Sequence, residues 1–233
     1  MDYHGRTVVI TGGTGSLGIA VVGALIAAGA ACHVPYRTET EARTFPHRSH
    51  TQVILYPQID LTDEDTVARL YQQIPDLWAS IHLAGGFAPG RLAATGKSIL
   101  ASQLDMNLVT CYLCCRNAVM AMAAHSTGGR IVNVAARPAL EWRTGAGMTA
   151  YAASKAAVAA LTVALAEEAV KDDILVNAVA PSILDTPANR KAMPKADHAA
   201  WPKVEDVAQT ILFLASPENK VTRGAIVPVY GRT

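Results

Sequence analysis

Short runs rich in valine and isoleucine alternate with helical segments along almost the whole chain, and this alternation restricts the fold more than any other feature. Such runs indicate βαβ units, in which right-handed crossovers join parallel strands. The expected strands are Thr7–Thr11, Ala31–Tyr36, Gln52–Gln58, Trp78–Ala84, Arg130–Ala135, Ile174–Ala180 and Ala225–Val229. The expected helices are Ser16–Ala28, Asp63–Gln73, Lys97–Ala124, Ala150–Val170 and Val204–Ala215. The sequence therefore predicts an α/β fold, a doubly wound parallel sheet of Rossmann type.

The length of 233 residues suits one α/β domain spanning residues 1–233, since no repeat or flexible linker divides the chain. The segment Asp185–Lys203 is the only long stretch rich in proline and polar residues. It follows a predicted strand, and open parallel sheets bind ligands beyond the carboxyl ends of their strands. We therefore interpret it as a substrate loop that contacts a small molecule.

The charge balance is close to neutral, with 20 Lys and Arg against 19 Asp and Glu, and gives no case for binding nucleic acid or an anionic membrane. The N-terminus lacks the pattern of a signal peptide, and no run reaches eighteen apolar residues. We therefore expect a cytoplasmic protein without a membrane-spanning helix.

Three of the four cysteines, Cys111, Cys114 and Cys115, crowd into one predicted helix. This spacing is poor for a disulfide framework, and no further metal ligand follows in the next nine residues. Apolar helix packing is the preferred interpretation, so no metal site is expected. His82 ends a predicted strand and is interpreted as a packed core residue.

A glycine-rich loop follows the first predicted strand and opens the first helix, with Gly13, Gly15 and Gly18 spaced as G-x-G-x-x-G. A tight turn, close backbone approach and a helix N-terminus are what a dinucleotide pyrophosphate needs. The loop residues expected to bind such a cofactor are Gly12, Thr14, Gly15, Ser16, Leu17 and Gly18.

Arg37 follows the second predicted strand, where an enzyme that uses NAD usually places an acid for the ribose hydroxyls. An arginine there suits a 2′-phosphate, and no acid appears before Glu39. We therefore expect NADP(H) to be preferred and NAD(H) to be possible. The alternative is that Arg37 is only a solvated loop cation.

Two further segments follow predicted strands. Asp60 and Leu61 follow the third strand, where Asp60 could cap the next helix or its backbone neighbours could meet the adenine. Ala84, Gly85 and Gly86 close the fourth strand, and their small side chains would let a cofactor lie flat against the backbone.

Tyr151 and Lys155 lie four residues apart on one face of a predicted helix. A free tyrosine titrates near pH 10, and a neighbouring ammonium lowers that pKa. The pair is therefore a candidate general acid/base unit near neutral pH.

At these motifs the whole chain resembles the short-chain dehydrogenase/reductase family. The match includes the glycine-rich loop, Asp60, Ala84-Gly85, Asn107, Tyr151, Lys155, Asn177–Pro181, Thr186 and the Val204–Ala208 segment. The resemblance implies an NAD(P)-dependent oxidoreductase that assembles as a homodimer or homotetramer. Two long apolar predicted helices, Leu100–Ala124 and Ala150–Val170, also favour self-association.

The resemblance also implies roles for individual residues. Tyr151 would be the proton donor, Lys155 would hold the nicotinamide ribose, and Asn107 would support a proton-relay water. Pro181, Ile183 and Thr186 would lie at the nicotinamide, with Ile183 and Thr186 at its carboxamide.

The chain departs from the family at Ala136, which occupies the position where the Ile131–Ala136 segment would normally end in serine. An alanine cannot donate a hydrogen bond to a substrate carbonyl. Thr144 and Thr149 are nearby hydroxyls that could replace it. The departure also leaves open an NADP(H)-binding sensor or a structural partner without chemistry.

The segment Leu184–Trp201 resembles dihydropteridine reductases, as do Ala84–Gly90 and the terminal Gly231–Thr233. Those enzymes also lack the serine, and their substrate is a quinonoid pterin. Two substrate classes therefore stay open, a quinonoid pterin-like ring and a small carbonyl compound. Trp142 and Trp201 could line a flat pocket or pack under a loop.

Overall fold

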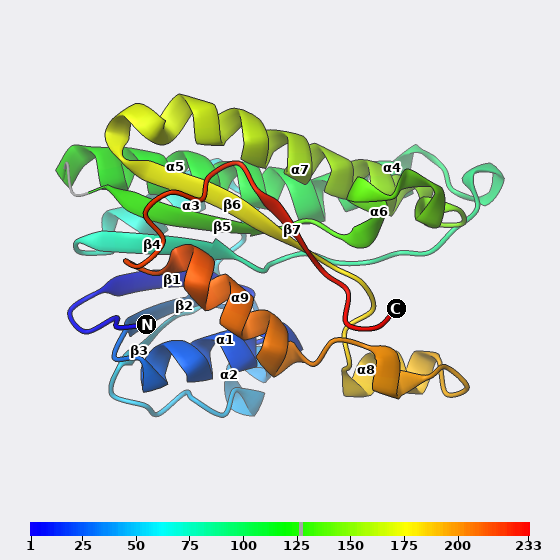
Figure 1. Ribbon diagram of the computed structural model, residues 1–233, viewed down its shortest axis with the longest axis horizontal. Helices are drawn as coiled ribbons and strands as arrows, with labels where there is room; N and C mark the ends of the chain where they lie inside the picture. Colours follow the sequence, from blue (N-terminus) through cyan, green and yellow to red (C-terminus); the bar gives the residue numbers. More distant parts are fainter. Residues whose placement is uncertain (126–127) are drawn as a thin grey trace.

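The computed structural model describes residues 1–125 and 128–233, and within them seven parallel strands form one sheet with the order β3-β2-β1-β4-β5-β6-β7 (Figure 1). The strands are β1 (Thr7–Thr11), β2 (Ala31–Pro35), β3 (Val53–Tyr56), β4 (Leu77–His82), β5 (Gly129–Val134), β6 (Ile174–Pro181) and β7 (Ile226–Val229). Because β1 pairs with both β2 and β4, the connections leaving β1 and β4 diverge and open a crevice at the carboxyl edge of the sheet. The predicted doubly wound α/β fold is confirmed.

Helices cover both faces of the sheet (Figure 1). They are α1 (Ser16–Ala27), α2 (Glu39–Thr44), α3 (Glu64–Gln72), α4 (Lys97–Leu104), α5 (Thr110–His125), α6 (Arg137–Leu140), α7 (Thr149–Glu168), α8 (Pro187–Ala192) and α9 (Val204–Ala215). On one face α1 packs against α9, and on the other α5 lies between α3 and α7. Each face has its own buried apolar cluster, so the sheet is covered on both sides.

All seven predicted strands are confirmed, with ends that shift by at most a few residues. The predicted long helical stretch Lys97–Ala124 is confirmed, and a π turn over Asp105–Val109 divides it into α4 and α5. That turn carries the buried Asn107, and a π turn inside a helix often marks a functional site. The short helices α2, α6 and α8 were not predicted, because four to six residues are too few to show a helical period.

The segment Thr149–Asp172 is long and apolar enough to cross a membrane by length and composition only, a test that the core helix of a globular domain also passes. It includes α7, which packs along β5 and β6 and against α4 and α6. The apolar residues of α7 therefore cover the sheet on one side. On its other side Val163 is exposed.

Candidate active site

The loop between β1 and α1 packs tightly against the segment that follows β4. Gly12 has a φ of +66°, and a Cβ there would lie 2.6 Å from the backbone nitrogen of Ala84. A Cβ on Gly18 would lie 2.2 Å from the carbonyl oxygen of Gly12. Gly15 caps α1 without a side chain, so the first amide groups of α1 suit an anionic phosphate. The predicted nucleotide loop therefore has the close approach and helix terminus that a dinucleotide needs.

Gly13, which the spacing had placed in the motif, has a packing role. Its Cβ would lie 2.8 Å from a Val34 methyl group on β2, so its missing side chain makes room for the neighbouring strand. Gly12 holds the left-handed backbone of the turn.

The end of β2 carries both signs of charge. Arg37 is exposed, and its backbone amide donates to Glu41 Oε2 at 3.0 Å. The Tyr36 hydroxyl donates to Glu39 at 3.1 Å. Sequence reasoning did not weigh Glu41, because a carboxylate four residues further along reaches back only once α2 forms. A cation and a carboxylate therefore both lie where the adenosine ribose would bind.

Asp60 faces this region. It accepts hydrogen bonds from the amide of Thr62 at 2.9 Å and from its hydroxyl at 2.7 Å. These bonds lower the pKa of Asp60, and the charge of Arg37 lowers it slightly further. The N-cap of α3 is Asp63, which accepts from the Thr66 amide at 2.7 Å, so the prediction that Asp60 caps that helix is wrong. Asp60 instead closes the turn before it, next to the half-buried Leu61.

Asn107 holds the loop that follows β4. Its Oδ1 accepts from the Gly86 amide at 3.0 Å, and its Nδ2 donates to the Gly86 carbonyl at 3.0 Å and to Ser154 Oγ at 3.1 Å. A Cβ on Gly85 would lie 2.6 Å from Asn107 Oδ1. The two glycines therefore leave room for the side chains of the π turn, as well as for any cofactor.

Lys155 is buried, and its Nζ donates to the carbonyl oxygen of Val134 at 2.7 Å. Burial lowers the pKa of Lys155 to about 8 and raises the pKa of Tyr151 to about 12. The predicted lowering of the Tyr151 pKa by Lys155 is therefore wrong for this structure. The reason is that removal of water from the phenol dominates, while the ammonium is directed to the end of β5.

Ala136 is buried in extended backbone directly before α6 and offers no donor. The Thr144 hydroxyl donates to the Glu141 carbonyl at 2.8 Å, so it is used within its own turn. Thr149 lines a different cavity. Neither threonine therefore replaces the missing serine.

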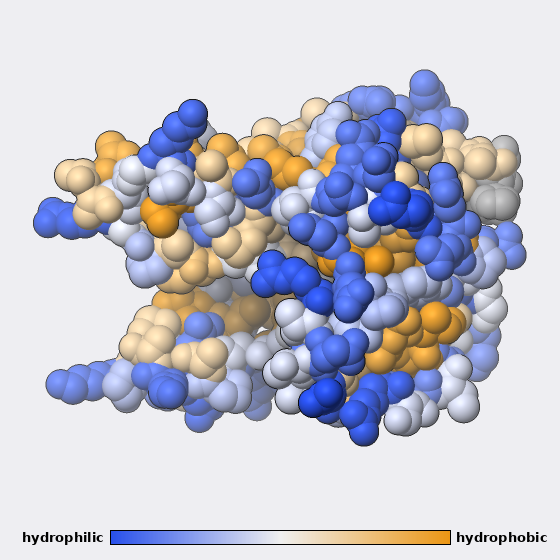
Figure 2. Space-filling model, turned by 180° about the vertical axis from the view of Figure 1, so that it is seen from behind, coloured by the Kyte–Doolittle hydropathy of each residue, from blue (hydrophilic) through white to orange (hydrophobic). Residues whose placement is uncertain are grey.

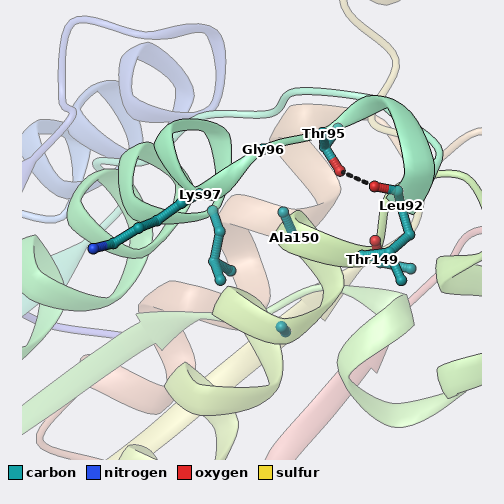
Figure 3. Close-up of a pocket in the computed structure, with 8 residues that line it drawn as sticks. Leu92, Thr95, Gly96, Lys97, Thr149 and Ala150 are labelled. Carbon is teal, nitrogen blue, oxygen red and sulfur yellow. Dashed lines mark hydrogen bonds between the residues drawn. The ribbon is translucent and has the colours of Figure 1, made fainter.

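That cavity, of about 310 Å³, lies between α4 and the first turn of α7 (Figure 3). Its lining residues are Leu92, Thr95, Gly96, Lys97, Leu100, Thr149, Ala150 and Ala153. Neither Tyr151 nor Lys155 belongs to its wall, and the Lys97 side chain extends away from it (Figure 3). It adjoins Tyr151 and Lys155 without containing them.

A hollow opens between two lobes at the carboxyl edge of the sheet, and both lobes show apolar residues toward it (Figure 2). The loops that follow β4, β5 and β6 carry exposed apolar side chains at this edge, namely Phe87, Trp142 and Ile183. Phe87 meets the Tyr151 ring edge to face, with centroids 5.0 Å apart.

The substrate loop packs on itself. Trp201 is buried against His198, with ring centroids 4.6 Å apart, so packing under a loop is the interpretation confirmed for this tryptophan. Thr186 caps α8 by accepting from the Asn189 amide at 3.2 Å, and Pro181 is buried at the end of β6.

Comparison with known proteins decides the family. The family model described as short chain dehydrogenase matches residues 6–197 of the chain. This chain belongs to the short-chain dehydrogenase family. It is an NAD(P)-dependent oxidoreductase with a single Rossmann-type sheet.

Several relatives align with nearly the whole length of this dehydrogenase. Galactitol 2-dehydrogenase of Rhizobium johnstonii is 33% identical and matches 97% of this chain and 93% of its own. Cis-4-hydroxycyclohexanecarboxylate dehydrogenase of Sinomonas cyclohexanicum is 32% identical and matches 97% of this chain and 95% of its own. Among solved structures, ElxO with NADP bound has a TM-score of 0.88 at 25% identity, covering 97% of both chains.

The structure of this dehydrogenase brings Asn107 and Lys155 to the loop that follows β4, and that loop packs against the β1–α1 loop. The individual roles that the family resemblance implies for them stay predictions. The sequence analysis did not predict the contact of Phe87 with the Tyr151 ring, for which the only signal was the position of Phe87 directly after Gly86. It also did not predict the hydrogen bond of Ser154 with Asn107, although Ser154 lies between Tyr151 and Lys155 in the sequence.

Proposed function

We propose that this dehydrogenase is an NADP(H)-dependent reductase of flat, conjugated substrates of quinonoid type, with a quinonoid pterin as the model compound. The observation that carries the proposal is Ala136, which removes the donor that a simple ketone oxygen needs as charge develops on it. A conjugated ring spreads that charge over several heteroatoms and depends less on one hydroxyl. The exposed rings of Phe87 and Trp142 suit such a substrate.

Arg37 and the β1–α1 loop support NADP(H) as the cofactor. A Cβ on Gly12 or Gly18 would fill the space at the start of α1, so this loop fits a dinucleotide pyrophosphate. The Arg37 guanidinium forms no ion pair with any residue the structure describes and is available to a 2′-phosphate. A structural relative, ElxO, binds NADP.

When bound, the nicotinamide supplies or accepts the hydride. Tyr151 supplies the proton from its hydroxyl, which its high pKa keeps protonated until the substrate draws on it. Lys155 keeps an ammonium beside the cofactor site, and Asn107 holds the Gly86 backbone in place. Phe87 restricts the motion of the Tyr151 ring.

Reduction of a small ketone, or oxidation of the matching alcohol, is the second candidate. It is favoured by the relatives that match along nearly their whole length, whose names describe dehydrogenases of galactitol and of a hydroxycyclohexane carboxylate. None of the relatives named above is a dihydropteridine reductase, so the pterin-like substrate rests on the loop sequence and on Ala136.

The test is NADPH oxidation by the purified protein with three substrate panels: quinonoid dihydropterin, small quinones, and aliphatic and aryl ketones. The proposal expects turnover with a quinonoid panel and at least about tenfold less with ketones, the order of effect of one missing donor. Turnover of ketones alone contradicts it. Binding of NADPH with no turnover on any panel would instead identify a sensor or structural partner.

We also propose a homodimer or homotetramer. Exposed apolar side chains lie on α4 (Ile99, Leu100), α5 (Tyr112, Met120) and α7 (Val163). Light scattering at micromolar concentration gives the mass, and a monomer would contradict the proposal.

A further inference from the structure

Two cysteines and a histidine meet where α5 packs against β4. Cys111 and Cys115 lie one turn apart on α5, and His82 ends β4. All three are buried, and their ligand atoms lie within 4.8 Å of one another. The linear sequence had shown only the cysteines, because His82 is brought to them by the packing of α5 on β4.

Two distances in this cluster match the edges of a tetrahedral metal site. Cys115 Sγ lies 3.5 Å from His82 Nδ1 and 3.5 Å from Asn133 Oδ1. With Zn–S near 2.3 Å and Zn–N or Zn–O near 2.1 Å, a tetrahedral edge between such atoms is about 3.5 Å. His82 Nδ1 also lies 2.8 Å from Asn133 Oδ1, a hydrogen bond that a cation would replace. Asn133 therefore offers an oxygen at the fourth position.

A second set of hydrogen bonds orients these side chains. Asn133 Nδ2 donates to Thr162 Oγ1 at 2.9 Å, which turns its oxygen toward His82. Ser80 Oγ lies 2.8 Å from His82 Nε2, and the Tyr71 hydroxyl lies 2.7 Å from Ser80 Oγ. Both hydroxyls can donate or accept, so Ser80 Oγ can accept a hydrogen bond from a protonated His82 Nε2. The Nδ1 lone pair of His82 is then free for a bond to a metal.

We propose that His82, Cys111 and Cys115, completed by the side-chain oxygen of Asn133, bind a thiophilic divalent cation of the Zn²⁺ type. Binding releases two thiol protons, and the two thiolates neutralise the cation. A neutral site is the form that a buried position tolerates. Soft thiolates with imidazole select this class of cation over Mg²⁺ or Ca²⁺.

Cys114 gives a matched control, because it is as buried as Cys115 and lies outside the cluster. The experiment produces wild type, Cys111→Ala, Cys115→Ser and Cys114→Ala in medium containing Zn²⁺, and measures bound zinc after passage over a chelating resin. Wild type and Cys114→Ala should retain about one zinc per chain. Loss of a thiolate should weaken binding by at least about 100-fold, since outer-shell changes alone cost 10–100-fold.

X-ray absorption at the zinc edge of the wild type needs no variant and is independent of folding defects. Two sulfur ligands and one imidazole are expected. A zinc-free wild type, equal zinc in Cys111→Ala, or a zinc shell without sulfur would overturn the proposal.

Discussion

The two sides of the crevice differ in what forms their surface. The cofactor side is formed by closely packed backbone, where Gly12 and Gly18 leave no room for even a Cβ. The substrate side is formed by exposed side chains, of which Phe87 is 56% exposed and Trp142 is 78% exposed. Adding a single Cβ at Gly12 or Gly18 on the cofactor side disturbs the turn, whereas the substrate side can accept different side chains at its exposed positions. We therefore propose that the backbone of the glycine-rich loop determines the cofactor class and that a few loop side chains determine the substrate class.

Tyr151 is the only proposed reacting group between these two sides, so its removal gives the largest effect. Tyr151→Phe should lower kcat by about 10²–10⁴, because positioned general acids contribute that much. The ring and its contact with Phe87 remain, so the fold and NADPH binding should be unchanged. Steady-state kinetics on the best substrate and fluorescence titration of NADPH measure the two quantities.

A nearly normal kcat in Tyr151→Phe would mean that the proton comes from elsewhere. A group other than Tyr151 would then have to be sought on either side of the crevice.

Arg37 tests whether the cofactor side contains a specific charge as well as a backbone cradle. Arg37→Ala should weaken NADPH binding by about 10–100-fold, because a charge-assisted bond to phosphate is lost, and should leave NADH nearly unchanged. Arg43→Ala is the matched control, since Arg43 is an exposed cation on α2. If the wild type binds NADPH and NADH equally, the predicted preference for NADPH is wrong. The negative charge of Glu41, which lies beside Arg37, would then offset the attraction of Arg37 for the 2′-phosphate.

Ala136 tests the substrate side. If ketones are the substrates, Ala136→Ser should raise kcat/KM for them by at least about tenfold, since one oxyanion donor contributes that much or more. If the substrate is a conjugated ring, the same change should leave native activity level or lower it. Ala135→Ser places the same hydroxyl one residue away and serves as the control. A large gain on ketones, with no pterin turnover in either protein, would contradict the quinonoid proposal.

The sequence predicted the features that depend on a single stretch of chain, and it did not predict those that depend on contacts between distant residues. The strands and the nucleotide loop are local features, because valine-rich runs and the glycine spacing indicate them within a single stretch of chain. The bonds of Asn107 to Gly86 and of Lys155 to Val134 join residues about twenty apart, and no spacing rule gives them. The Tyr151 pKa was predicted in the wrong direction because burial, which outweighs the neighbouring charge, becomes visible only in three dimensions.

Lys155 lies between the two sides and gives the smallest effect, a dependence on pH. Burial lowers its pKa from 10.5 to about 8, so the ammonium is lost as pH rises through that value. The charged form is the one expected to hold the ribose, so kcat/KM for NADPH, which reports the free enzyme, should be level near pH 7 and fall by about twofold at pH 8. Lys155→Arg cannot lose its proton in this range and should show a level profile between pH 7 and pH 9, even if its activity is lower throughout. A level profile in the wild type would show that Lys155 stays charged at all working pH values, and the same decline in Lys155→Arg would show that another group titrates.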